Sequence, residues 1–218
     1  MLKAVCRRYG MRLVGPNGLG VAAFGTGIAM DATFGAHTPL GGSAGVGVQS
    51  GGVGIAVLDH LSRLGIGAGS FASLGDKADV SGNDLLAWWS QDPGTKMVLL
   101  HLESFGNPRK FARYARRVAH VKPVLTVAAG RSAAGSRAAA SHTSAAITPG
   151  ITRDALYRQA GVIATRSVPC GGGGRAGRGG KGREPLRLVR AISVRARRGG
   201  GRGAGQRDPA RLWRAEER

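Results

Sequence analysis

Short apolar runs alternate with segments of helical periodicity along residues 46–164. The apolar runs predict strands, because β-branched and other apolar side chains suit a buried sheet. Apolar residues that recur three or four positions apart predict a helix in each of the gaps between these runs. The predicted strands span residues 46–50, 67–73, 96–102, 123–128 and 162–164, and the predicted helices are centred on residues 53–64, 85–89, 111–118 and 155–160.

This alternation predicts a parallel sheet with helices on both faces, since crossover connections between parallel strands are right-handed. The expected fold is an α/β, flavodoxin-like, doubly wound domain over residues 45–168. Ahead of it, residues 3–9 could end a helix, and residues 11–14 could form a buried strand that has no earlier strand to pair with. Residues 1–22 are therefore interpreted as the remnant of a preceding domain, and residues 23–44 as a linker.

The composition of the chain changes near Pro169. Residues 169–218 hold 14 of the 32 Lys+Arg and 13 of the 38 Gly, and they carry half of the net charge of +20. Such a Gly/Arg-rich segment builds no apolar face, which predicts a disordered basic tail. Because Gly, Arg, Ala and Pro have GC-rich codons, a shifted reading frame would produce this tail. The alternative is an arm that binds nucleic acid, which is disfavoured because Trp213 is its one aromatic residue.

Cysteine usage and hydropathy narrow the class of protein. Cys6 and Cys170 lie far apart, without a CxxC pair or a histidine at ligand spacing, so neither a disulfide framework nor a metal site is predicted. No apolar run approaches the roughly 18 residues of a membrane span. The N-terminus also lacks the apolar core of a signal peptide. We therefore expect a cytoplasmic protein with no membrane partner.

The carboxyl ends of the predicted strands carry the candidate chemistry, since ligands bind at that edge of a parallel α/β sheet. Ser50, Gly51 and Gly52 follow the first strand, where two glycines let an anion approach the free N–H groups of the next helix. The alternative is a serine cap, with glycines that serve only the turn. Residues 75–79 follow the second strand, and their Asp and Lys side chains could bind a cation or a substrate amine, or could cap a turn.

His142 and Glu103 are the candidate catalytic pair. His142 lies among small residues, 138–146, which suit close approach to other groups, and an imidazole acts as acid, base or nucleophile near pH 7. Glu103 ends an apolar strand, from which its carboxylate could orient one imidazole nitrogen and leave the other reactive. The alternatives are a surface histidine and a solvated carboxylate.

A series of ordered motifs covers the chain from about residue 3 to residue 167: residues 12–17, 49–56, 73–80, 102–109, 129–143 and 158–163. Together these motifs resemble the α-type portion of the ADP-forming acyl-CoA synthetases, or acetate–CoA ligases. This family is related to the α subunit of succinyl-CoA synthetase. Several motifs in the same order are far more specific than any one of them.

The resemblance implies part of a ligase that interconverts acyl-CoA, phosphate and ADP with free acid, CoA and ATP through a phosphohistidine. It implies that His142 is phosphorylated and that Glu103 steadies it. It also implies that the helix start at Ser50, Gly51 and Gly52 binds the phosphoryl group, in agreement with the separate argument from the helix dipole.

The resemblance further implies that residues 1–22, with Gly15, Pro16 and Asn17, are left from a CoA-binding Rossmann domain. CoA and ATP or ADP, the latter with Mg²⁺, would then be bound largely by parts that this chain lacks, including an ATP-grasp subunit or domain. We expect the chain to be inactive without them. A related branch of lysine acetyltransferases has a similar region without the histidine, so His142 favours the ligase. The alternatives are an inactive or regulatory fragment of a CoA-binding or acetyltransferase-type protein, and a basic protein that binds nucleic acid through its Arg/Gly tail.

Overall fold

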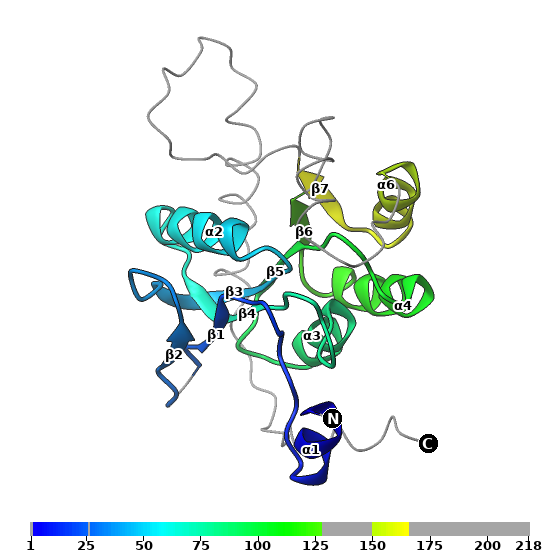
Figure 1. Cartoon of the computed structure of the whole chain (residues 1–218). Helices are drawn as coiled ribbons and strands as arrows, with labels where there is room; N and C mark the ends of the chain where they lie inside the picture. The colour runs from blue at the N-terminus through cyan, green and yellow to red at the C-terminus, as the bar shows by residue number, and fades with distance from the viewer. Residues whose placement is uncertain (1, 26, 128–149, 166–218) are drawn as a thin grey trace.

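A mixed β-sheet forms the centre of the protein. The computed structural model describes residues 2–25, 27–127 and 150–165, which are drawn in colour in Figure 1. Within these residues, seven strands pair in the order β2-β1-β4-β3-β5-β6-β7. β1 pairs antiparallel with β2 and β4, whereas β4, β3, β5, β6 and β7 run parallel to one another. The strands are β1 Gly20–Ala23, β2 Met30–Thr33, β3 Gly41–Val48, β4 Ala68–Ser73, β5 Met97–His101, β6 Val124–Val127 and β7 Ile163–Thr165.

Helices cover both faces of this sheet. α2 lies on one face, and α3, α4 and α6 lie on the other (Figure 1). Buried side chains form one apolar cluster on each face, with Leu61 of α2 in the first cluster and Phe111 of α4 and Tyr157 of α6 in the second. The described helices are α1 Leu2–Arg8, α2 Gly51–Arg63, α3 Gly82–Trp89, α4 Pro108–Ala119 and α6 Gly150–Gln159.

The strand order confirms the predicted doubly wound fold. The chain passes from β3 through α2 to β4 on one side of β3, and then through α3 to β5 on the other side of β3. It continues outward through β6 to β7. This is the order typical of flavodoxin-like sheets. The four helices predicted between the strands correspond to α2, α3, α4 and α6.

The amino-terminal part of the fold differs from the sequence prediction. The sheet is mixed rather than wholly parallel, because β1 and β2 join its edge in antiparallel fashion. β2 lies inside residues 23–44, which were predicted as a linker, and β3 begins at Gly41. Residues 11–14, predicted as a buried strand, form no strand.

These differences follow from partners that lie far along the chain. β1 and β2 have four residues each and only one buried residue between them, so they show no clear alternation of apolar side chains. Residues 11–16 run instead beside the loop that follows β4. There the N–H of Val80 donates to the carbonyl of Leu13 over 3.0 Å, and the N–H of Ala78 donates to the carbonyl of Gly15 over 2.9 Å.

Trp89 anchors α3 against the middle of the sheet. Its side chain is fully buried, and its Nε1 donates to Ser70 Oγ of β4 over 2.9 Å. Gly45 of β3 makes room for the indole, because a Cβ at this position would lie 2.6 Å from the ring. The glycine in the strand therefore lets α3 approach the sheet closely.

Two of the sequence predictions concern residues that the structure does not describe. His142 and the predicted disordered tail, residues 169–218, lie outside the described residues. Among the helices that the structure does describe, none combines the length and apolar character needed to cross a bilayer.

Candidate functional site

The carboxyl ends of β3 and β5 meet at the point where the strand order reverses. The chain leaves β3 into α2 on one face of the sheet and leaves β5 toward α4 on the other (Figure 1). In doubly wound sheets, ligands bind at this point. Val48 of β3 pairs with His101 of β5, and Ser50 and Glu103 each follow two residues later. Both predicted site residues therefore lie at the same edge of the sheet.

The start of α2 is an open helix N-terminus. Ser50 precedes the helix in an extended conformation, with φ −98° and ψ 125°, and its hydroxyl makes no capping hydrogen bond within the described residues. The interpretation of Ser50 as a side-chain cap is therefore not supported. The first N–H groups of a helix have no acceptor inside the helix. The first turn of α2 contains no acidic residue, and a Cβ at Gly52 would meet no described atom within 4 Å.

Gln49 connects this helix start to the loop that carries Glu103. The Gln49 side chain is buried, and its Oε1 accepts hydrogen bonds from the N–H groups of Glu103, over 3.0 Å, and Ser104, over 3.3 Å. Its own N–H donates to the carbonyl of His101 over 2.8 Å. Its Nε2 is buried without a partner among the described residues. Gln49 lies in the motif of residues 49–56 but was not predicted as a site residue, although an amide at the end of an apolar strand is a recognisable signal.

We expect Gln49→Leu to lower the free energy of unfolding by about 2 kcal/mol, because it leaves the N–H groups of Glu103 and Ser104 without their acceptor. Denaturation of the full chain by guanidinium chloride measures this change. Gln91→Leu, at an exposed position, is the matched control and should stay within about 0.5 kcal/mol of the unsubstituted chain. Equal stabilities of the two variants would show that the Gln49 bonds contribute nothing.

Glu103 itself is buried, with 8% of its surface exposed, and its charge acts on Lys77. Lys77 Nζ donates to the hydroxyl of Ser104 over 2.6 Å and to its carbonyl over 2.7 Å. Burial lowers the pKa of Lys77 to about 8, and the Glu103 carboxylate opposes that shift. The candidate carboxylate therefore lies beside a partly desolvated ammonium group.

The turn formed by Gly15, Pro16 and Asn17 lies against the loop that carries Lys77. The N–H of Asp76 donates to the carbonyl of Pro16 over 3.0 Å. A Cβ at Gly75 would lie 2.1 Å from that carbonyl oxygen, so only glycine permits this approach. The structure thus brings this turn to the carboxyl edge of the sheet, next to the loop that follows β4.

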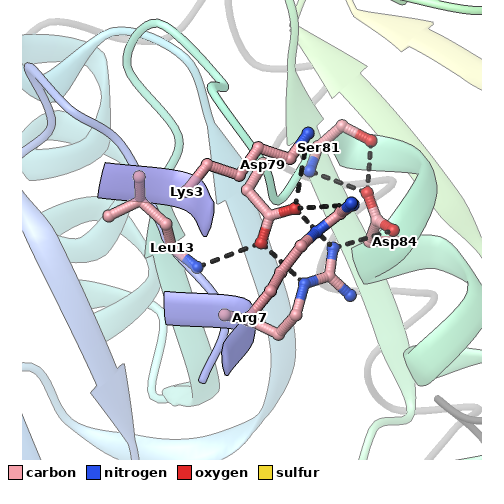
Figure 2. A network of polar contacts seen from close by, with 7 residues as sticks. Lys3, Arg7, Leu13, Asp79, Ser81 and Asp84 are labelled. Carbon is pink, nitrogen blue, oxygen red and sulfur yellow. Dashed lines mark hydrogen bonds and ion pairs between the residues drawn. The ribbon is translucent and has the colours of Figure 1, made fainter. Parts of the chain in front are cut away.

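Asp79 anchors the amino-terminal segment, as Figure 2 shows. Its side chain is 2% exposed, and its carboxylate accepts from Arg12 Nε over 2.7 Å and from the N–H of Leu13 over 3.1 Å. Lys3 and Arg7 of α1 form longer ion pairs with it, at 3.8 and 3.7 Å. Desolvation opposes ionisation, but the Arg12 and Leu13 hydrogen bonds outweigh it and lower the pKa of Asp79. Its role is to join segments, rather than to bind a cation or a substrate amine.

Arg12 extends the same network to the start of α3. Its Nη2 lies 3.6 Å from Asp84 Oδ1, and Asp84 in turn accepts the N–H of Ser81 over 2.8 Å. The described residues contain no group of three His, Cys, Asp or Glu side chains that could hold a metal ion.

The fold and the site together define an α/β domain with candidate phosphate-binding and carboxylate groups at its switch point. Residues 41–169 match the family described as the succinyl-CoA ligase like flavodoxin domain. The chain belongs to this family.

Relatives and solved structures agree with this assignment. Acetate–CoA ligase [ADP-forming] I of Archaeoglobus fulgidus is 41% identical over 167 residues, which are 77% of this chain and 24% of the relative. The α subunit of acetate–CoA ligase [ADP-forming] I of Pyrococcus furiosus is 35% identical over 77% of this chain and 36% of the subunit. The chain therefore spans between about a quarter and a third of the length of these curated relatives.

Among solved structures, the dinucleotide forming acetyl-coenzyme A synthetase 1 of Ca. Korarchaeum cryptofilum, in complex with phosphate and ADP, has a TM-score of 0.69 and is 36% identical. The match covers 77% of this chain and 36% of that chain. The flavodoxin-like fold is thus shared with a longer protein that binds phosphate and ADP.

Proposed function

We propose that this chain forms the phosphohistidine-bearing part of an ADP-forming acid–CoA ligase. Such an enzyme interconverts acyl-CoA, phosphate and ADP with the free acid, CoA and ATP. The observation that carries the proposal is that Gln49 joins the open start of α2 to the buried Glu103 at the switch point of the sheet. Relatives that are named as ADP-forming acetate–CoA ligases support it.

In this proposal, His142 is the nucleophile. One imidazole nitrogen forms a bond to phosphorus while the bond from phosphorus to its leaving group breaks. Glu103 accepts the N–H of the other imidazole nitrogen and stabilises the positive charge that the ring gains. The N–H groups at Gly51 and Gly52, with the positive end of the α2 dipole, bind the phosphoryl oxygens. Each group thus acts on a charge that appears during transfer.

In this proposal, the remaining substrates are bound largely by other parts of the enzyme. We assign CoA, and ATP or ADP with Mg²⁺, to a CoA-binding domain and to an ATP-grasp subunit or domain. The relative from Pyrococcus furiosus is named as an α subunit, which supports a partner of this kind. Gly15, Pro16 and Asn17 would mark the side of this domain that faces the CoA-binding part. Without these partners, we expect no turnover by the chain alone.

The helix start can be tested with an added charge. We expect Gly52→Glu to weaken the binding of inorganic phosphate by at least about tenfold, because the new carboxylate would repel the anion. Gly52→Ala is the matched control, since a Cβ there meets no described atom within 4 Å, and it should bind phosphate about as well as the unsubstituted chain. Titration with phosphate followed by calorimetry measures both. If Gly52→Glu bound phosphate normally, the anion would not lie at the start of α2.

A further inference from the structure

Lys77 joins two loops that follow different strands. It comes after β4, whereas Ser104 comes after β5, and β3 lies between these two strands in the sheet. The Lys77 side chain therefore reaches across the end of β3 to donate to both the hydroxyl and the carbonyl of Ser104. Both acceptors belong to Ser104, the residue that follows Glu103, and one of them is a backbone carbonyl. Together they fix the position of the ammonium group.

The backbone at Lys77 has a conformation that residues other than glycine rarely adopt. Its φ is 51°, in the left-handed region, which costs energy unless the surroundings impose it. The surroundings do so here, because the N–H groups of Asp76 and Ala78 are bound by the carbonyls of Pro16 and Gly15, on either side of Lys77. The loop that holds Lys77 is thus fixed by backbone hydrogen bonds on both sides of it, and from this loop the lysine side chain reaches Ser104.

We propose that Lys77 is a positioning residue for Glu103. By binding Ser104, its ammonium group fixes the backbone next to Glu103 and so holds the Glu103 carboxylate in place. This inference rests on the proposed function, in which Glu103 accepts the imidazole N–H. In the proposal, Lys77 touches neither the phosphoryl group nor the imidazole.

Several other charged or titratable groups lie around Lys77. Among the described residues, the charge that acts on the pKa of Lys77 is that of Glu103. Asp76, in the same loop as Lys77, is exposed to solvent. His101 of β5 interacts with both Glu103 and Arg153 of α6, and burial lowers the pKa of His101 below 6.5. The Lys77 ammonium is lost only as the pH rises through about 8, so a change in that range reports on Lys77.

The test uses the full chain and phosphoramidate, a small phosphoryl donor. The P–N bond of the donor breaks as the imidazole nitrogen bonds to phosphorus, and ammonia leaves. Mass spectrometry locates the phosphate on each histidine, and the rate at His142 is measured from about pH 6 to about pH 10. Ratios between variants at one pH cancel the pH dependence of the donor.

At pH 7, we expect Lys77→Met to slow the labelling of His142 about tenfold, as a misplaced catalytic group would. The ratio between the unsubstituted chain and Lys77→Met should fall as the pH rises past about 8, because the neutral amine of the native lysine then binds the Ser104 oxygens more weakly. Lys77→Arg keeps its charge in this range and should retain most of the rate without the alkaline loss. Lys96→Met, at an exposed lysine, should change nothing.

Ser104→Ala provides a second test, which remains valid if Lys77→Met does not fold. It removes the hydroxyl acceptor and keeps both the lysine charge and the carbonyl, so we expect a rate about threefold lower. If His142 is labelled at equal rates with and without Lys77 or the Ser104 hydroxyl, the inference is wrong and the proposed function stands. If His142 of the unsubstituted chain takes up no phosphate, both fall.

Discussion

Asp79→Asn is expected to release the amino-terminal segment from the domain and to lower the free energy of unfolding by about 2–3 kcal/mol. The native carboxylate is almost fully buried and binds Arg12, Leu13, Lys3 and Arg7 at once (Figure 2). An asparagine keeps one carbonyl acceptor but loses the charge that holds the three cations. Guanidinium denaturation measures the stability, and hydrogen exchange at the Leu13 amide measures the release.

The lowered pKa of Asp79 determines how the effect of Asp79→Asn on stability changes with pH. The pKa of Asp79 in the folded chain is lower than its usual value of 3.8, so its stabilising effect is present above about pH 4 and is lost as the pH falls through the lowered pKa. Asp79→Asn should therefore lose that part of the acid sensitivity. At neutral pH it should be less stable than the unsubstituted chain, and the difference should shrink in acid.

Asp59→Asn is the matched control for Asp79→Asn. Asp59 pairs with Arg63 one turn along α2, at 3.0 Å, but both side chains are more than half exposed. Exposed pairs of this kind are worth about 0.5 kcal/mol or less. If Asp79→Asn were as mild as Asp59→Asn, and the Leu13 amide kept its protection, the network in Figure 2 would not hold the segment.

The parallel part of the fold could be predicted because its signal is local. The apolar run at Met97–His101 and the apolar face of Pro108–Ala119 each specify their own element. The positions of Ser50 and Glu103 followed from one general rule, that ligands lie at the carboxyl ends of parallel strands. β1 and β2 carry no such signal, since their short, partly exposed sequences are strands only because β4 offers them an edge.

The contacts that organise the candidate site could not be predicted, because each joins residues far apart in the chain. Lys77 and Ser104 are separated by 27 positions, Gln49 and Glu103 by 54, and Arg12 and Asp79 by 67. Residues 75–79 had suggested either a ligand site or a turn. The structure shows that Asp79 anchors residues 12–16 to this loop, whereas Lys77 reaches past the end of β3 to the loop that follows β5.

His142→Ala is expected to abolish the formation of acid-labile phosphate at the site. In the proposed reaction, this imidazole is the group that bonds to phosphorus. His120→Ala is the control, because His120 is exposed at the end of α4 and is assigned no part in the chemistry. The fold of both variants is checked by thermal unfolding.

The most direct measurement is therefore the position of the phosphate after the full chain has reacted with phosphoramidate. Phosphohistidine is labile in acid and stable in alkali, so it can be distinguished from phosphate esters and located by mass spectrometry at high pH. We predict that His142 is labelled faster than the exposed His37 and His120, and that His142→Ala loses this rapid phase. A rapid phase of the same size in His142→Ala would contradict the assignment of this chain as the phosphohistidine-bearing part of a ligase.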